Sequence, residues 1–353
     1  MKTLNWQSPP QHGGDLARAK ALHSDISPDD WLDLSAGLNP QPWPIPQIPT
    51  DCFTRLPEDY SALLTAAAEY YQQESLWPVS GSQQIIELLP KLRQNACVAV
   101  PEVGYQEHAW CWLKAGHKVM TYCDDELEQA AETCDVVVVI NPNNPGGQRY
   151  PQARLLTLQQ RLASRNGWLI VDEAFMDALS EQDQAESSLT VKAQLDGLIV
   201  LRSIGKFFGL AGIRSGFVLC QQALLDPIRQ GLGPWHMNGV SAYLTQQLLL
   251  DREWHYRARA TLSLHMNQQR LQLDRLFEPQ GRSIGYTPLF YTCYHPAAYQ
   301  LQQQLAQQGI WVRYFSQSSW LRFGLADNPQ ALGRLVQALD QSLNQSLKRR
   351  LWL

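Results

Sequence analysis

The sequence has no long hydrophobic run, no basic cluster and no closely paired cysteines, and each absence excludes a class of protein. No apolar segment approaches membrane-spanning length, and the first ten residues carry no apolar signal region. The basic residues are scattered and the net charge is −4, which argues against a nucleic-acid partner. Without a CxxC pair, the cysteines predict no metal site and instead buried free thiols in a cytoplasmic protein. They are Cys52, Cys97, Cys111, Cys123, Cys134, Cys220 and Cys293.

What the sequence does have is an alternation of short apolar runs with helical stretches. Its 353 residues are enough for a large domain and a smaller one. The alternation is typical of an α/β protein with a mostly parallel, seven-stranded sheet. The last two runs are joined by too short a segment for a helical crossover, so we expect them to pair antiparallel. The expected strands cover residues 76–79, 97–100, 118–122, 136–140, 168–172, 198–202 and 216–220.

The pattern changes after about residue 222. A long helical region runs to Leu276 and is interrupted near Gly231 to Pro234. Two later helices and three strands then predict a small α+β domain, at 290–294, 297–308, 310–314, 320–325 and 329–347. We therefore expect three parts: an N-terminal arm, a large domain, and an interdomain helix with the small domain. Their ranges are 1–45, 46–230 and 231–353.

Three consecutive strands end in residues that can do chemistry. Asn144 follows the run of valines at 136–139, Asp172 closes the next strand, and Lys206 follows the one after that. In open α/β sheets, ligands bind beyond the carboxyl ends of the strands. Each residue has a plain structural alternative, since Asn-Pro forms turns, an aspartate caps helices and a loop lysine aids solubility. Their shared placement favours a functional site, in which Lys206 binds a phosphate or forms a Schiff base.

With these motifs, the chain resembles the fold-type I pyridoxal-phosphate enzymes of the aspartate aminotransferase superfamily. The motifs are Asn-Pro-Gly-Gly at 144–147, Asp-Glu-Ala-Phe at 172–175, and Ser203-x-x-Lys206 with Arg214 eight residues further on. The resemblance implies pyridoxal 5'-phosphate as cofactor, bound covalently by Lys206. Asp172 would hold the pyridine nitrogen protonated and Asn144 would donate a hydrogen bond to the 3-oxygen. Ser203 and Arg214 would hold the phosphate.

Two more stretches match the cofactor site of that superfamily. A strand, a glycine turn and a helix start meet at Gly81, Ser82 and Gln83, where free backbone N–H groups favour a phosphate. A simple helix cap by Ser82 is the alternative. Tyr105 follows another strand and, by resemblance, covers the pyridine ring. The alternative is a tyrosine that only packs in the core.

Candidate substrate ligands lie near both ends of the chain. His12 belongs to a His-Gly-Gly arm, and Asn39 belongs to a Ser-Ala-x-x-Asn-Pro turn that leads into a proline-rich segment. By resemblance, the arm contributes to the small domain and to the active-site edge, and in the decarboxylase-like branch of the superfamily these elements approach the substrate. A surface histidine and a turn asparagine are the alternatives. Arg322 stands where the family grips the substrate α-carboxylate, unless it forms a surface ion pair. Arg214, His12 and Arg313 are candidates for a substrate phosphate.

Two departures separate the branches. Histidinol-phosphate aminotransferases carry a tyrosine where this chain has Phe175, and a second tyrosine where it has Leu56. Together with the His-Gly-Gly arm and the segment 105–109, these departures resemble the threonine-phosphate decarboxylases of cobalamin biosynthesis. That resemblance implies decarboxylation of L-threonine O-3-phosphate by a homodimer. The alternatives are an aminotransferase of the histidinol-phosphate type and a non-catalytic module that kept the fold.

Overall fold

The computed structural model describes residues 1–10 and 13–350, with side chains described as far as residue 344, and within them the chain forms two compact units. The large unit consists of 1–10, 42–144 and 148–257. The small unit consists of 11–41, 145–147 and 258–353. The predicted boundary at residue 230 differs from this division. The large unit extends to Arg257 because helix α11 (Gly239–Leu250) packs against α2 (Asp51–Thr54) and α3 (Ser61–Tyr71) of that unit.

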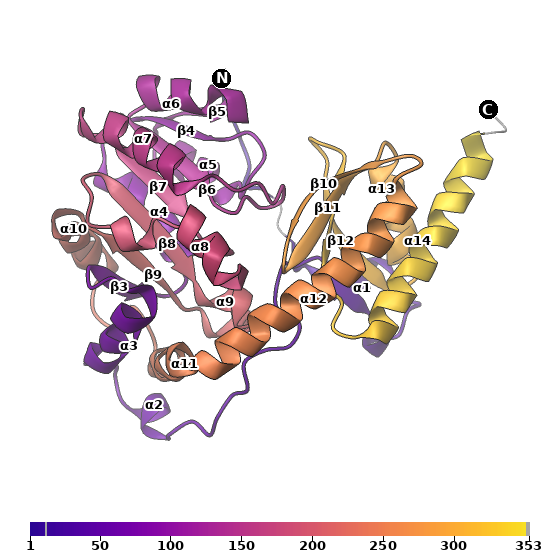
Figure 1. Cartoon of the computed structure of the whole chain (residues 1–353), viewed down its shortest axis with the longest axis horizontal. Helices are drawn as coiled ribbons and strands as arrows, with labels where there is room; N and C mark the ends of the chain where they lie inside the picture. The colour runs from indigo at the N-terminus through magenta and orange to yellow at the C-terminus, as the bar shows by residue number, and fades with distance from the viewer. Residues whose placement is uncertain (11–12, 351–353) are drawn as a thin grey trace. The chain divides into compact units, whose positions relative to one another are not determined.

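Within the described residues, the large unit contains one eight-stranded sheet, ordered β1-β5-β4-β6-β7-β8-β9-β3 (Figure 1). The predicted α/β fold is confirmed, and all seven expected strands are present. Strands β8 and β9 pair antiparallel, as their short connection predicted. The additional edge strand β1 spans only two residues, too few for a sequence pattern. The strands are β1 Lys2–Thr3, β3 Leu76–Val79, β4 Cys97–Pro101, β5 Lys118–Tyr122, β6 Val136–Ile140, β7 Trp168–Asp172, β8 Leu198–Ser203 and β9 Gly216–Cys220.

The central strands are apolar along their whole length because helices cover both faces of the sheet. All five residues of β6 are buried, and four of them are valine, whose branched side chain suits a pleated surface. Alternate residues such as Val136, Val138 and Ile170 pack in one cluster with Ile85 and Trp112 from the helices. This double-sided core holds β6, β7 and β8 side by side, which sets the positions of the loops at their carboxyl ends.

The helices of the large unit are amphipathic segments between these strands. Two helices end at Leu232 and at Phe277, within a few residues of the ends that the sequence predicted. Among the described helices, none combines the length and the apolar character that crossing a membrane requires. Besides α2, α3 and α11, the helices are α4 Ser82–Leu88, α5 Glu107–Lys114, α6 Leu127–Thr133, α7 Gln152–Ala163, α8 Glu181–Ser187, α9 Ile204–Phe207 and α10 Gln222–Leu232, and α12 Arg252–Phe277 continues into the small unit.

The small unit contains, among the described residues, a five-stranded sheet ordered β10-β11-β13-β12-β2 (Figure 1). Strand β2 comes from the N-terminal arm and pairs parallel with β12. Strand β10 was not expected from the sequence, because Arg282–Thr287 is mostly polar and contains Gly285. The elements are α1 Leu16–Leu22, β2 Leu32–Leu34, β10 Arg282–Thr287, β11 Phe290–Tyr294, α13 Ala298–Ala306, β12 Ile310–Phe315, β13 Trp320–Gly324 and α14 Pro329–Arg350.

In the two units together, short 3₁₀ turns lie at Pro28–Asp30, Leu89–Leu92, Asp124–Glu126, Met176–Ala178, Thr190–Lys192 and Ala211–Ile213.

Candidate active site

The sheet brings the three strand-end residues to one edge of the large unit. Asp172 lies in register between Ile140 of β6 and Leu201 of β8. Asn144 follows Ile140 by four residues, and Lys206 follows Leu201 by five. Because β6, β7 and β8 are parallel, their carboxyl ends meet at the same edge, and an amide, a carboxylate and a primary amine gather there.

Asp172 is a buried carboxylate with two fixed partners. Its Oδ1 accepts a hydrogen bond of 3.1 Å from the backbone N–H of Ala174, and its Oδ2 lies 2.9 Å from Nε2 of His108. Asp172 is 3% exposed and His108 is 2% exposed. The imidazole therefore sets the orientation of the carboxylate. The sequence analysis did not select His108; the available signal was its position three residues after Tyr105, near the start of α5.

Lys206 lies in the single turn of α9, directly after β8. Its Nζ is 5.7 Å from the centroid of the Phe175 ring, which is itself 3% exposed. The face of an aromatic ring attracts a cation, so Phe175 contacts the amine with an apolar, electron-rich surface. Phe175 thus contributes shape and low polarity beside the lysine, without a hydroxyl group.

A tight turn at Gly81 places Arg214 beside the start of α4. Gly81 has a φ of +76°, and a Cβ there would lie 2.8 Å from Nη2 of Arg214. Gly216, the register partner of Ser203, packs equally closely, because a Cβ on it would be 3.2 Å from the backbone nitrogen of Ser82. Arg214 is itself exposed. An arginine thus lies close against a glycine turn, an arrangement that we call the cradle; that it binds a phosphate stays a prediction.

Polar groups next to this cradle form a short hydrogen-bonded chain. The Tyr105 hydroxyl donates to Oε1 of Gln83 at 3.0 Å, and Nε2 of Gln83 donates to Glu107 at 3.2 Å and to Glu87 at 3.0 Å. Burial raises the pKa of Tyr105 well above its usual value, so the hydroxyl stays protonated and acts as a donor. Gln83 therefore holds Tyr105 at the carboxyl edge of the sheet.

A second group of charges lies in the small unit. Arg322 of β13 stands opposite Arg313 of β12 in the antiparallel register, and Arg322 is 6% exposed. An Nη2 of Arg322 donates to the carbonyl oxygen of Ser35, which follows β2. Burial and, to a smaller extent, the neighbouring Arg313 lower the pKa of Arg322 to about 9, against a partly offsetting effect of Asp33. Two adjacent cations in such a setting favour the binding of anions.

The N-terminal arm lies directly against these arginines. A Cβ at Gly13 would be 2.7 Å from the carbonyl oxygen of Ser35 and 3.4 Å from Nη2 of Arg322, so only glycine fits there. The backbone N–H of Gly14 donates to the Ser35 hydroxyl at 2.9 Å. Asn39 is buried, and its Oδ1 accepts a hydrogen bond from the backbone of Gln41, which is the turn geometry that the sequence left open. His12 lies outside the described residues.

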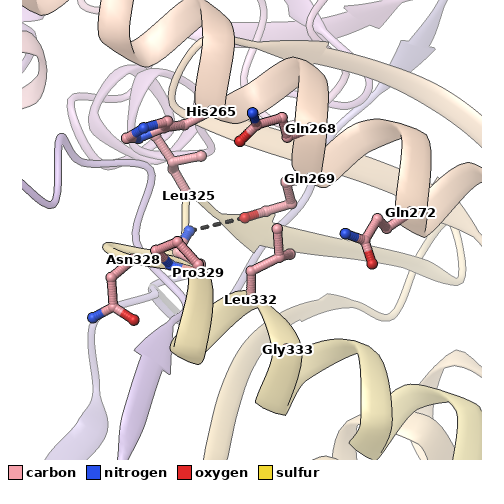
Figure 2. Close-up of a pocket in the computed structure, with 10 residues that line it drawn as sticks. His265, Gln268, Gln269, Gln272, Leu325, Asn328, Pro329, Leu332 and Gly333 are labelled. Atoms are coloured by element: carbon pink, nitrogen blue, oxygen red, sulfur yellow. Dashed lines mark hydrogen bonds between the residues drawn. The ribbon is translucent and has the colours of Figure 1, made fainter.

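A separate pocket lies elsewhere in the small unit and includes none of the predicted site residues (Figure 2). It has a volume of about 250 Å³ and lies between α12 and the start of α14. Gln269 at its wall is committed to the backbone, since it donates to Gly324 and accepts from Ala326. The pocket is lined by His265, Gln268, Gln269, Gln272, Leu325, Ala326, Asn328, Pro329, Leu332 and Gly333.

Comparison with known proteins assigns the chain to a family. The pattern of the family described as aminotransferase class I and II matches residues 52–339. A threonine-phosphate decarboxylase of Pseudomonas aeruginosa is 42% identical over 330 residues, which cover 93% of this chain and 97% of that protein. One of Sinorhizobium sp is 37% identical over 342 residues, which cover 94% and 98%. The chain therefore belongs to the aminotransferase class I and II family, and within that family to the threonine-phosphate decarboxylases.

Solved structures of the same fold show a similar arrangement of the chain. The histidinol-phosphate aminotransferase from Sinorhizobium meliloti, crystallised with pyridoxal-5'-phosphate, superposes with a TM-score of 0.76 at 19% identity. The match covers 96% of this chain and 96% of that one. At this identity the likeness concerns the fold alone.

Proposed function

We propose that the protein catalyses the pyridoxal-phosphate-dependent decarboxylation of L-threonine O-3-phosphate to (R)-1-amino-2-propanol O-2-phosphate. The observation that carries this proposal is the identity of 42% and 37%, across nearly the whole chain, to two threonine-phosphate decarboxylases. Phe175 supports the same reaction, because the tyrosine of the histidinol-phosphate aminotransferases is missing at that position. A place in cobalamin biosynthesis and a cytoplasmic location stay predictions.

The residues of the large unit fit pyridoxal phosphate. The cradle of Gly81, Ser82 and Arg214 suits a phosphate group, and Ser203 borders it through its register partner Gly216. The carboxylate of Asp172 and the amine of Lys206 provide a partner for a pyridinium nitrogen and a nucleophile for an aldehyde. When bound, the cofactor withdraws electrons from the α-carbon of the substrate.

The protein groups around the ring then have separate tasks. Asp172 would stabilise a protonated ring nitrogen by its negative charge, and His108 keeps that carboxylate in one orientation. Asn144 would donate a hydrogen bond to the 3-oxygen. Tyr105, held by Gln83, would supply an aromatic face for the ring.

Lys206 would carry the proton that the substrate α-carbon receives. With cofactor and substrate bound, the primary amine of Lys206 would be placed to deliver a proton to the substrate α-carbon in place of the lost carboxylate. Phe175 limits water near this amine, because its buried ring covers one side of it. The same amine could remove an α-proton in a transaminase, so the choice of bond depends on how the substrate carboxylate is held.

The small unit contains the arginines that would hold the substrate carboxylate. Arg322 would bind the α-carboxylate, and its fork of N–H donors suits two carboxylate oxygens. Arg313, next to it in the sheet, is a candidate for the substrate phosphate, together with His12 and Arg214; Asn39 belongs to the same arm. A buried guanidinium beside a half-buried one favours a substrate with two anionic groups, as threonine phosphate has.

One assay of the purified protein separates this reaction from the alternative. With L-threonine O-3-phosphate and no keto acid, we expect release of CO₂ and of the amine product over many turnovers. Histidinol phosphate with 2-oxoglutarate should give no comparable turnover. If the protein instead converts its cofactor stoichiometrically to pyridoxamine phosphate without CO₂, it is an aminotransferase of the histidinol-phosphate type.

We propose further that the protein is a homodimer. Four large apolar side chains of the large unit are 54–65% exposed: Ile45, Phe53, Leu56 and Trp235. Large exposed apolar side chains of this kind are candidates for an interaction surface. In sedimentation at micromolar concentration we expect a dimer that Phe53→Asp weakens, while Leu264→Asp, at an equally exposed leucine of the small unit, leaves it intact. An active monomer would contradict this assembly.

A further inference from the structure

Three residues in the middle of the large unit's sequence belong to the small unit. Pro145–Gly147 group with the small unit, whereas the residues before and after them, up to Asn144 and from Gln148, group with the large one. Asn144 is the proposed donor to the 3-oxygen of the cofactor. The segment that immediately follows this donor is therefore held by the strands that carry Arg322.

One side-chain hydrogen bond fixes this segment. The hydroxyl of Thr292 in β11 donates to the carbonyl oxygen of Pro145 at 2.7 Å, and Thr292 is fully buried. A buried carbonyl without a partner is unfavourable, so this bond determines where the backbone of Pro145 can lie. No pattern in the sequence indicates this contact, since its two ends lie 147 positions apart in the chain.

Glycines in the segment 145–147 and in β10 allow the two backbones to approach each other closely beside that bond. A Cβ at Gly147 would lie 2.7 Å from the backbone nitrogen of Tyr286, and a Cβ at Gly285 would collide with the carbonyl oxygen of Gly146. The pairing of β10 with β11 shifts register between Ser283 and Gly285, at the same place. The close approaches of Gly147 to Tyr286 and of Gly285 to Gly146 do not involve Thr292, and they hold the same segment, Pro145–Gly147.

Thr292 also stands in the row of residues that carries the anion site. It is the register partner of Arg322, which is in turn the register partner of Arg313. Residues directly opposite each other in antiparallel strands point to the same face, so the three side chains form one row across the sheet. Arg313 and Arg322 form one end of this row, and Thr292, which donates to the carbonyl oxygen of Pro145, forms the other.

We propose that Thr292 is a positioning residue that links Arg322 to Asn144 through the backbone of Pro145. This inference rests on the proposed function, in which Arg322 binds the substrate carboxylate and Asn144 contacts the cofactor. Occupation of Arg322 then fixes β13 and β11, and the Thr292 bond transmits that fixed geometry to Asn144. The hydrogen bond to the 3-oxygen is thereby firmest when a correctly seated carboxylate is present.

The test compares Thr292→Val, which removes the hydroxyl at nearly equal volume, with Thr292→Ser, which keeps it. Thr287→Val is the matched control, because Thr287 is a buried threonine of the same hairpin whose hydroxyl accepts only from the local Leu289 N–H among the bonds described. Three quantities are measured for each holoenzyme: the dissociation constant for pyridoxal phosphate, the pH midpoint of the absorption band of the bound cofactor, and the ratio of CO₂ to pyridoxamine phosphate.

A weaker donor at the 3-oxygen strengthens the hold on the proton shared between that oxygen and the Lys206 nitrogen. We therefore expect Thr292→Val to move the pH midpoint upward by about half a unit, which is about threefold in proton affinity. It should also raise the share of pyridoxamine phosphate, whereas Thr292→Ser and Thr287→Val resemble the wild type in both. Unchanged spectra and product ratio in a folded Thr292→Val protein, or equal shifts in Thr287→Val, would overturn the link.

The spectroscopic arm needs no substrate, so it tests the link independently of the reaction. If the wild type forms no CO₂ from threonine phosphate but the midpoint shift is specific to Thr292→Val, the proposed reaction fails and the link stands. If CO₂ is formed and the shift is absent, the reaction stands and the link fails.

Discussion

The two charged regions of the molecule are assembled in different ways. At the carboxyl edge of the large sheet, Asn144, Asp172 and Lys206 come from three consecutive strands that are neighbours in the sheet. In the small unit, Arg313 and Arg322 meet across an antiparallel pair, and the arm residues Gly13 and Ser35, almost 300 positions earlier in the chain, close over them. The first region follows chain order, whereas the second depends on strand register and on the returning arm. In the proposed function, this contrast corresponds to the division between the chemistry of the cofactor and the recognition of the substrate.

The largest expected effect tests the cofactor side of this comparison. Lys206→Ala should reduce turnover by roughly a thousandfold or more, because the nucleophile and proton carrier are lost together. The protein should also lose the near-visible absorption band that the cofactor gives when it is joined to this lysine. The measurement is steady-state CO₂ release with an absorption spectrum. Full activity in a folded Lys206→Ala protein would end the pyridoxal-phosphate assignment.

The next effect tests the substrate side. Arg322→Ala should raise KM about ten- to a hundredfold, because a charged hydrogen-bonded pair contributes about 1.5–3 kcal/mol. It should also increase abortive transamination, because no residue would then fix the position of the substrate carboxylate. Quantifying CO₂, amine and pyridoxamine phosphate checks both effects. Arg334→Ala, at an arginine of the same unit that only contacts backbone carbonyls among the bonds described, is the control and should change neither.

A pH profile measures the same region without removing Arg322. Its pKa is lowered to about 9, mainly by burial and then by Arg313. The guanidinium is therefore charged below this pH and loses its proton above it, so kcat/KM for the anionic substrate should fall as the pH rises through about 9. Arg313→Gln removes the neighbouring positive charge and should move the break to higher pH. The substrate ammonium group titrates in the same range, but its contribution is identical in both proteins. An identical break would contradict the coupling.

The smallest effects concern the ring contacts of the cofactor. Phe175→Tyr should keep activity within a few-fold of the wild type, because Asn144 is the main donor to the 3-oxygen. Asn144→Ala should reduce kcat clearly and weaken cofactor binding. Parallel measurements of kcat and of the cofactor dissociation constant distinguish the two. If Phe175→Tyr proved as harmful as Asn144→Ala, Phe175 would be needed for its apolar contact with Lys206.

The sequence by itself determined the sheet and the placement of Asp172 and Lys206 at its carboxyl edge. Buried parallel strands are continuous apolar runs, and the residue that follows each run lies at the ligand-binding edge, so Asp172 and Lys206 could be found from order alone. The division at residue 257, strand β10 and the two-residue β1 were not predicted, because packing between helices and short edge pairing leave little pattern.

Only the tertiary structure decided which side chains meet. His108 reaches Asp172, Arg313 reaches Arg322, and Thr292 reaches Pro145 because register and packing bring distant positions within hydrogen-bond or van der Waals range. Spacing along the chain contains no information about such contacts, since a shift of one residue in a strand would turn each side chain to the opposite face.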